Sequence, residues 1–407
     1  MSLGQSDVMT SGIGIPVTIA VIAGARPQFM KIAAFQRAVR RWNTHFTQSA
    51  QQVNAIYVNS GQHYDSSLST TFFEELNIHF DIDLTHTYES RRPIDMLGNM
   101  IIKLYDAFDQ INSSVDWVIV VGDTNTTMAG AIAAAKRKLP LAHIEAGVRL
   151  VTLTNTEEQN RVVTERLSTV LFLTSKQDRQ NLTREGINRH VVWSGDIIYD
   201  LVKDVMPDLS AGYGLNTPDK YVLATLHREE TVQSDETMFH IMRALNSYGE
   251  RVVFVCHPHT RQRLNELQLD NLSNITYIDA LSYKKMLSAI KGSSFVVTDS
   301  GGVQRESYYL GKRCLILQEQ AFWPSLVQAG IHRTIGPSED SIRAGFAWMK
   351  TALAHNELPS CTDLGDGNAG STILHTLVDL THKELRKNNF SKFGGKRRSI
   401  DREGICT

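Results

Sequence analysis

The chain has 407 residues, enough for two domains of roughly 150–200 residues each. Hydrophobic residues make up 42% and charged residues 21%, which is typical of a globular protein and excludes a disordered one. The formal net charge of −1 gives no electrostatic basis for a nucleic acid as partner. No uncharged apolar run reaches about 18 residues, so we expect no transmembrane helix and no membrane partner.

The cysteines of the chain point to a cytoplasmic protein, and its two ends are expected to be tails. Residues 1–16 lack the basic-then-apolar order of a signal peptide and are interpreted as a tail. Residues 388–407 are rich in Lys, Arg, Gly and Asn, which predicts a basic, mobile tail. The spacing of the cysteines matches no zinc or CxxC motif, and two of them lie in apolar runs, as buried free thiols do. They are Cys256, Cys314, Cys361 and Cys406. We therefore expect a reducing, cytoplasmic environment.

Short apolar, β-branched runs recur along the chain between longer helical stretches. The first series comprises residues 17–23, 54–59, 116–121, 140–145 and 169–174, and the second 221–226, 252–256, 275–278, 294–298 and 314–317. Runs without in–out alternation indicate parallel strands that are covered on both faces. Helical patterns such as 126–138 and 238–250 provide the crossovers. The order predicts an α/β protein with two doubly wound, Rossmann-like domains whose parallel sheets face each other across a cleft.

The break between the two series sets the expected domain boundaries. We place the first domain at 17–198 and the second at 199–367, with a C-terminal helix at about 368–387 that packs back on the first domain. Segment 193–220 reads as a helix followed by a linker with Gly and Pro. Ligands of such sheets bind at the carboxyl ends of the strands, so the polar residues just after each strand are the candidates for a site.

In the first domain, two cations and three carboxylates follow strands. Arg26 and Lys31 stand at the start of a helix, where they either form an anion site with the positive helix end or are solvated surface side chains. Asp123 is a candidate base or a helix N-cap. Glu145 follows a buried strand, and Glu157 begins a helix on which Arg161 lies four residues later. Carboxylates gathered in one cleft perturb each other's pKa and suit proton transfer, whereas singly each reads as a surface ion pair.

The second domain offers histidines and a glycine-rich turn. His227 and Arg228 follow one predicted strand and His257 follows the next. The two histidines of the HPH run lack helical ligand spacing, so we expect no metal. The run DSGG enters a helix, where small residues let a diphosphate approach backbone N–H groups, or simply cap the helix. This run supplies Ser300, Gly301 and Gly302, and Glu306 one turn on can accept hydrogen bonds from ribose hydroxyls.

Nine segments in this order resemble the non-hydrolysing UDP-N-acetylglucosamine 2-epimerase family, a branch of the GT-B fold. They are GARPQFMK, SGQHYD, VVGDTNTT, HIEAGVR, TEEQNR, LHREET, HPHTR, TDSGGVQRE and GDGNAG, and they span about residues 17–380. The combination of GARPQF, SGQHYD and SGDIIYD looks most like the subgroup that acts on UDP-2,3-diacetamido-glucuronic acid, with a plain UDP-N-acetylglucosamine epimerase close behind.

The resemblance implies inversion at C2 of a UDP-2-acetamido-sugar, by elimination of UDP to a glycal followed by re-addition of UDP, without a cofactor. By motif, the catalytic residues of the family are matched by Asp123, Glu145, Glu157 and His227. Positions that bind the substrate are matched by Arg26, Lys31, His257, Ser300, Gly301, Gly302 and Glu306, and supporting positions by Arg149, Glu158, Arg161 and Arg228. An activator site for a second UDP-sugar is matched by Gln62 and His63. Family members are commonly homodimers, and their sugars typically feed bacterial surface polysaccharides.

One departure from the family pattern bears on the sugar. Segment 318–325 reads QEQAFWPS, without the Arg and the two acidic residues that are usual there. The change puts the identity of the sugar in doubt more than that of the nucleotide. It leaves open a hydrolysing epimerase that releases N-acetylmannosamine and UDP. The resemblance is also compatible with a GT-B glycosyltransferase and with a catalytically silent protein that binds a UDP-sugar.

Overall fold

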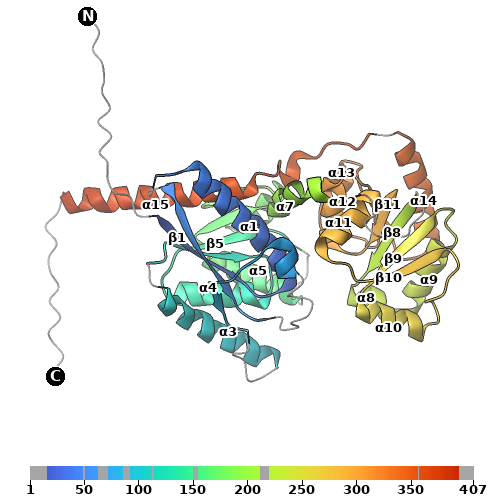
Figure 1. The fold of residues 1–407 in the computed structure, drawn as a ribbon, viewed down its shortest axis with the longest axis horizontal. Coiled ribbons are helices and arrows are strands. Elements are labelled where there is room, and N and C mark those ends of the chain that lie inside the picture. Colours follow the sequence, from blue (N-terminus) through green and yellow to red (C-terminus); the bar gives the residue numbers. More distant parts are fainter. Residues whose placement is uncertain are drawn as a thin grey trace, which may run out of the picture.

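The structure, a computed structural model, describes residues 16–48, 51–62, 72–85, 92–111, 114–149, 155–210, 220–355 and 357–393, the last of these from 384 on by backbone alone. Two lobes lie side by side, and each is built on one sheet (Figure 1). The predicted α/β class with two doubly wound parallel sheets is confirmed. Among the described residues no helix is long and apolar enough to cross a membrane.

The sheet of the first lobe has seven parallel strands in the order β3-β2-β1-β4-β5-β6-β7. They are β1 Val17–Ala23, β2 Val53–Asn59, β3 Ile82–Asp83, β4 Trp117–Val121, β5 Leu141–Ala146, β6 Val170–Leu173 and β7 Val191–Trp193. Five of them coincide with the predicted apolar runs. The two edge strands β3 and β7 escaped prediction because two or three residues carry no pattern of their own.

The sheet of the second lobe has six parallel strands in the order β10-β9-β8-β11-β12-β13. They are β8 Tyr221–Leu226, β9 Arg251–Cys256, β10 Ile275–Asp279, β11 Phe295–Thr298, β12 Cys314–Ile316 and β13 Arg333–Thr334. Strands β8, β11 and β12 are buried along their whole length, as expected for apolar runs without alternation. Cys256, Cys314 and Cys361 are buried free thiols, and Cys406 lies outside the described residues.

Helices cover both faces of each sheet (Figure 1). The first lobe has α1 Arg26–His45, α3 Pro93–Ala107, α4 Asn125–Lys136, α5 Thr156–Leu167, α6 Asp178–Arg184 and α7 Ile197–Val205. The second has α8 Glu229–Val232, α9 Asp235–Asn246, α10 Pro258–Glu266, α11 Tyr283–Gly292, α12 Gly301–Tyr309, α13 Pro324–Gln328 and α14 Glu339–Ala354. Short 3₁₀ turns lie at Phe108–Gln110, Met206–Asp208 and Thr362–Leu364.

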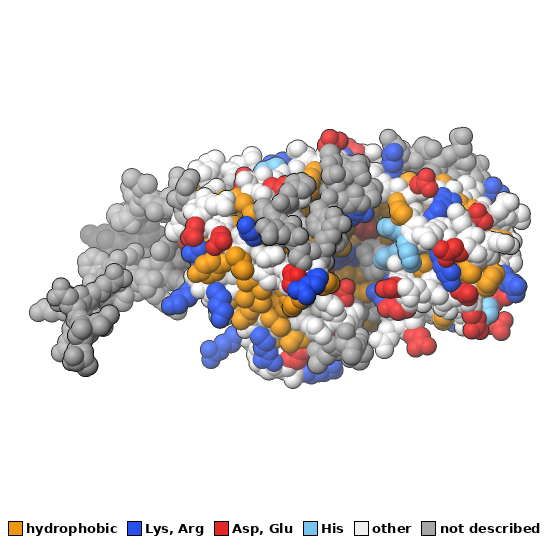
Figure 2. All heavy atoms as spheres, turned by 90° about the horizontal axis from the view of Figure 1, so that it is seen from below, with side chains coloured by type: hydrophobic (Ala, Val, Ile, Leu, Met, Phe, Trp, Pro, Cys, Tyr) orange, Lys and Arg blue, Asp and Glu red, His pale blue; other side chains and the backbone are white. Residues whose placement is uncertain are grey.

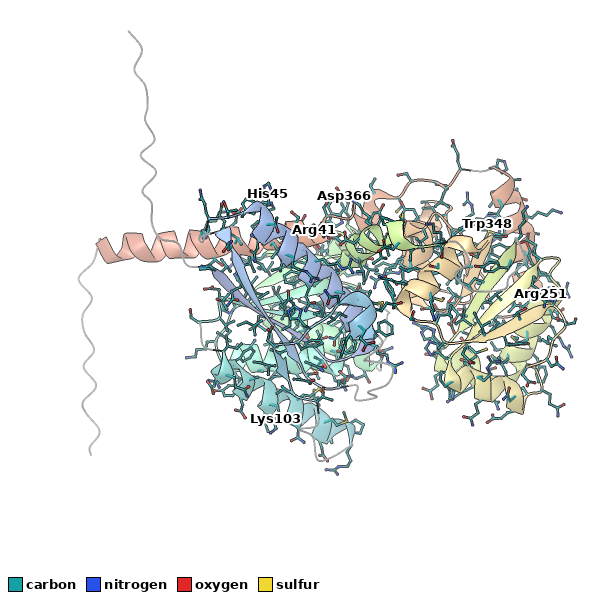
Figure 3. The ribbon with its side chains drawn as sticks, viewed as in Figure 1. Arg41, His45, Lys103, Arg251, Trp348 and Asp366 are labelled. Carbon is teal, nitrogen blue, oxygen red and sulfur yellow. The ribbon has the colours of Figure 1, made fainter. Side chains whose placement is uncertain are left out.

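The last helix, α15 (Ala369–Phe393), returns from the second lobe and packs on α1 and α7 of the first. The Asp200 carboxylate of α7 accepts hydrogen bonds from the backbone N–H groups of Ala369 (3.0 Å) and Gly370 (2.8 Å), which satisfies the start of α15. The nearby Asp366 lies between the two lobes on the side opposite the cleft (Figure 3). Helix α15 continues past the expected end at residue 387, so 388–393 belong to the helix and not to the predicted tail.

One buried glutamine holds the loop after β1 in shape. Gln28 Oε1 accepts from the backbone N–H groups of Gly24 (2.9 Å) and Ala25 (3.0 Å), while its amide group donates to Val121 O (2.9 Å) and Thr127 Oγ1 (3.1 Å). The side chain is fully buried, so all four contacts are shielded from water. Gln28 thereby ties the carboxyl ends of β1 and β4 together, where the candidate residues stand.

Replacing Gln28 by Ala is expected to lower the free energy of unfolding by roughly 2–3 kcal/mol, because buried donors and acceptors lose their partners. Chemical denaturation followed by circular dichroism measures this change. The matched control is Gln180→Ala on the exposed side of α6, for which we expect a change within about 0.5 kcal/mol. Equal effects of the two substitutions would contradict the role given to Gln28.

Candidate active site

The candidate residues gather at the carboxyl ends of the strands, on the facing edges of the two lobes. Viewed from below, a hollow separates the lobes and histidine side chains line one of its walls (Figure 2). In both sheets the strand order reverses beside the first strand, between β1 and β4 and between β8 and β11. Such a reversal is where doubly wound sheets open a crevice for ligands. Arg26 and Asp123 flank the first reversal, and His227 and Ser300 flank the second.

Glu145 stands at the centre of the site with cations from both lobes. Its carboxylate bonds Lys31 Nζ of α1 at 2.6 Å and Arg305 Nη1 of α12 at 2.8 Å. Burial alone would raise the pKa of Glu145, but the charges of Lys31 and Arg305 outweigh it and lower that pKa to about 2. The residue is therefore a carboxylate at neutral pH. Arg305 also bonds the fully buried Asp196, which joins the second lobe to the segment just before α7.

The backbone at Glu145 is strained. Its φ angle is +70°, in the left-handed region that β-carbon-bearing residues rarely adopt, and the β5–β6 register shifts there in a bulge. Strain of this kind persists only where the surroundings enforce it, and it concentrates at functional sites. Gly122 makes room for the contact, because a β-carbon on it would lie 2.9 Å from Lys31 Nζ. His143 supports Gly122 through a 2.7 Å hydrogen bond to its carbonyl oxygen.

Asp123 is held by an arginine of α5. The Asp123 carboxylate pairs with Arg161, and about a quarter of the Asp123 side chain stays exposed. Arg161 also forms an ion pair with Glu158 at 2.9 Å. The sequence pattern placed Arg161 on one face with Glu157, but the guanidinium instead pairs with Glu158 and Asp123. Glu157 is exposed on the first turn of α5, and no described contact joins it to the other two carboxylates. Asn155 caps this helix by accepting from the backbone N–H of Glu157 at 2.8 Å.

Arg149 orders the loop that follows Glu145. Its guanidinium pairs with Glu165, with Glu185 (2.6 Å) and with Glu158 (3.4 Å). Glu165 in turn accepts from the backbone N–H of Gly147 at 2.6 Å. The chain is therefore pinned on both sides of the strained residue. The supporting role that the resemblance implies for Arg149 and Glu158 stays a prediction.

His227 is oriented by a carboxylate to which the sequence patterns gave no role. Asp299 has no exposed surface, and it accepts from His227 Nδ1 (3.1 Å) and from the backbone N–H groups of His227 (3.1 Å) and Arg228 (3.0 Å). With Nδ1 donating to Asp299, Nε2 is the ring atom left to act on a ligand. The His227 ring is partly exposed and lies 5.8 Å, between centroids, from that of His257.

The glycine-rich turn begins α12 directly after Asp299. Ser300 is the N-cap, with its Oγ 3.5 Å from the backbone N of Val303. A β-carbon on Gly301 would lie 2.7 Å from the Phe322 ring, whereas one on Gly302 would meet no atom closer than 3.9 Å. The backbone at Gly302 is thus open to a ligand at the positive end of a helix, which is a ready anion site.

The remaining predicted ligand-binding residues lie on both sides of the hollow. Glu306 is buried on α12, and this burial raises its pKa to about 7 although the charge of Arg305 opposes it. Arg26 is the first residue of α1. Desolvation together with the charges of His227 and Arg26 lowers the pKa of His257.

Of the two residues expected at an activator site, the structure describes one, Gln62. Gln62 Oε1 accepts from the backbone N–H of Thr126 (2.9 Å) and from its hydroxyl (2.8 Å), which caps the start of α4. His63 lies outside the described residues. The activator site stays a prediction.

Sequence reasoning missed Arg305 and Asp299 as members of the site. Both belong to the motif TDSGGVQRE, but their positions in the sequence do not predict which residues they contact. Asp299 ends a strand, and that position alone could have marked it. Arg305 reaches Glu145 over 160 positions of sequence separation, which only the folded chain discloses.

Comparisons with known proteins agree on one family. The model of the UDP-N-acetylglucosamine 2-epimerase family matches residues 46–378. A UDP-2,3-diacetamido-2,3-dideoxy-D-glucuronate 2-epimerase of Pseudomonas aeruginosa is 33% identical over 374 residues, covering 89% of this chain and 99% of the relative. A UDP-N-acetylglucosamine 2-epimerase of Methanocaldococcus jannaschii is 29% identical over 382 residues, covering 88% of this chain and 98% of the relative.

Solved structures show the same likeness. The Methanocaldococcus jannaschii enzyme in complex with UDP-GlcNAc and UDP superposes with a TM-score of 0.75 at 28% identity, covering 89% of this chain and 99% of that one. The enzyme of Neisseria meningitidis bound to UDP-GlcNAc gives a TM-score of 0.77 at 25% identity, covering 89% of this chain and 100% of that one.

Proposed function

Because the chain belongs to the UDP-N-acetylglucosamine 2-epimerase family and is a UDP-sugar 2-epimerase, we propose how its own residues divide the inversion at C2. The first lobe supplies the acid–base carboxylates and the second lobe holds the UDP. The observation that carries the division is the ion pair between Glu145 and Arg305, which joins the candidate base to the helix that begins at the glycine-rich turn.

Asp123 and Glu145 exchange the C2 proton on opposite faces of the sugar. Asp123 follows β4 and Glu145 is the last residue but one of β5, and these two strands are paired, so both residues stand at the same edge of the sheet. One carboxylate removes the proton, the C–H electron pair becomes the C1=C2 bond of a glycal, and the C1–O electrons leave with UDP. The partner residue, which must enter this step as the protonated acid, then donates its proton to C2 from the opposite face as UDP adds back to C1. The two groups afterwards exchange protons with water, which restores the starting state. Glu157 is kept as a third candidate for this exchange on the resemblance alone.

The leaving UDP is stabilised by the second lobe. A carboxylate with a pKa of about 2, such as Glu145, is a weak base, so proton removal depends on stabilising the charge that develops on the diphosphate. The N-terminus of α12 at Gly302, the Arg26 guanidinium and the Nε2 atom of His227 converge on that charge. Glu306, one turn further along α12, holds the ribose.

Replacing Asp123 by Asn should reduce epimerisation by roughly 10²–10⁴-fold, since an amide cannot take a proton from carbon. UDP affinity should stay near that of the wild type, because Asp123 belongs to the other lobe. Proton NMR in D₂O with UDP-GlcNAc follows deuterium at C2 and the manno product, and calorimetry follows UDP binding.

The same spectra separate the candidate activities. A manno-configured UDP-sugar with deuterium at C2 identifies non-hydrolysing epimerisation. Free sugar with stoichiometric UDP identifies a hydrolysing enzyme, and binding without exchange identifies a different activity. Near-normal turnover of the Asp123→Asn variant would remove Asp123 from the mechanism.

Asp299→Asn should lower kcat by roughly 10–100-fold, because the amide keeps one acceptor oxygen and no charge for the three N–H groups that Asp299 binds, so the tautomer of His227 is no longer fixed. If Asp299 acts by orienting His227, its loss lowers kcat only when His227 is present. In the His227→Ala background the same substitution should therefore change kcat little, and a double-mutant cycle measures this coupling. Additive losses in the two backgrounds would assign Asp299 a purely structural part.

We also infer a homodimer that pairs through the outer face of α3. Ile94 and Ile102 are exposed by 69% and 58%, and Gly98 between them has open space where a β-carbon would be. These three positions are four residues apart and lie on one side of the helix. Apolar side chains gather on this lobe (Figure 2), and Lys103 marks the outer side of α3 (Figure 3). Such a stripe suits the close approach of a second copy.

Changing both Ile94 and Ile102 to Glu should convert a dimer to a monomer in light scattering after gel filtration, because like charges would meet across the two-fold axis. The matched control is Phe239→Ser, which alters an exposed apolar residue on α9 of the other lobe. A wild-type chain that is monomeric at micromolar concentration would contradict the inference.

A further inference from the structure

A cavity of about 330 Å³ opens between the lobes beside the candidate site. Segments 148–149 and 175–181 of the first lobe and 320–324 of the second line it. The last of these lies within the segment whose sequence departs from the family pattern. The proposed division of the reaction gives this cavity no role.

The cavity adjoins both halves of the proposed chemistry. The Phe322 ring in its wall packs against Gly301 of the glycine-rich turn, and the Arg228 guanidinium lies over the same ring at 4.5 Å. On the opposite wall, Asp178 packs against Gly147, two residues after Glu145. A sugar held between the turn and Glu145 therefore has this cavity next to it.

Charge in the cavity walls is unfavourable to an anion. Arg149 is the one cation among the lining residues, all of which the structure describes, and three carboxylates already surround it. Asp178 is exposed by only 8%, and one of its oxygens accepts from the backbone N–H of Ser175 at 3.0 Å. Burial, reinforced by the charges of Asp363, Glu145 and Glu165, raises the pKa of Asp178 to about 7. A further carboxylate beside Arg149 and Asp178 would lie among acids, and the one cation of the lining is already paired, which makes its burial there costly.

The other walls suit uncharged groups. They present the amides of Asn181 and Gln320, the hydroxyl of Ser175, and the rings of Phe322 and Trp323. Amides and hydroxyls exchange hydrogen bonds with a neutral polar substituent, and the aromatic rings accept its methyl group.

We propose that this cavity receives the outer substituents of the sugar ring and selects uncharged ones, a hydroxyl or an acetamido group, against a carboxylate. The proposal rests on the proposed function and names its substrate class, a UDP-2-acetamido-sugar without an acidic group. It separates this chain from the Pseudomonas aeruginosa relative, whose name gives a glucuronate as its substrate.

The first test compares two substrates that differ only at C6, UDP-GlcNAc and the corresponding UDP-N-acetylglucosaminuronate. We expect kcat/KM to be larger for UDP-GlcNAc by roughly tenfold or more, since binding the uronate leaves a charge unpaired. Equal or better turnover of the uronate contradicts the proposal and leaves the proposed function standing. Absence of C2 deuterium exchange with both substrates overturns the proposed function itself.

Two substitutions test the charge argument. Gln320→Lys, in an exposed loop, supplies the missing cation and should raise the ratio of kcat/KM for the uronate over UDP-GlcNAc by about fivefold. Asp178→Asn, which keeps an oxygen for the Ser175 N–H, should shift the ratio in the same direction. The matched control Gln262→Lys on exposed α10 adds the same charge away from the cavity and should leave the ratio unchanged. An unchanged ratio in both cavity variants, or an equal shift in the control, would refute selection by charge.

Discussion

Much of this structure depends on one anion, exposed by only 14%, where the two lobes meet. The carboxylate of Glu145 sits at a left-handed backbone position and is held by Lys31 from its own lobe and by Arg305 from the other. Removing either cation would leave a buried charge without full compensation, which costs far more than the pair itself contributes. The arrangement therefore sets the approach of the two lobes as well as the ionisation of the residue. The strained backbone, the bulge in β5 and the small residue at Gly122 are the local conditions that let the carboxylate reach both partners.

Each lobe of the protein supplies half of the proposed reaction. In the proposed reaction the first lobe places carboxylates beside a carbon-bound proton, and the pairing of Glu145 with Lys31 and Arg305 makes that carboxylate a weak base. The second lobe would compensate by placing a helix N-terminus and a histidine where negative charge leaves with UDP. Neither half is effective alone, since a weak base needs a stabilised leaving group. Asp299 shows how the second half is built, because a single buried carboxylate ties the His227 loop to the start of the glycine-rich turn.

Segment 318–325, whose sequence departs from the family pattern, packs against the start of the glycine-rich turn. Phe322 fills the space over Gly301, and the Trp323 indole donates a 2.8 Å hydrogen bond to the Gly301 carbonyl oxygen. The Arg305 guanidinium lies 4.9 Å from the centre of the Trp323 ring. Aromatic side chains thus support the glycine-rich turn and the central cation from behind. The same segment forms one wall of the neighbouring cavity, so it contacts both the glycine-rich turn and the cavity proposed for the sugar substituents.

The sequence by itself determined the fold class, the central strands of both sheets and the places where polar residues follow strands, but not the short edge strands β3, β7 and β13. These features depend on local patterns, namely continuous apolar runs, helical periodicity and small residues at turns. Motif resemblance added the family and most of the candidate residues. Tertiary structure alone decided the partners: Arg161 with Asp123 rather than with Glu157, Asp299 beneath His227, and Arg305 across the cleft on Glu145. Ion pairs between distant segments follow from how two sheets pack and close, and no spacing along the chain encodes that geometry.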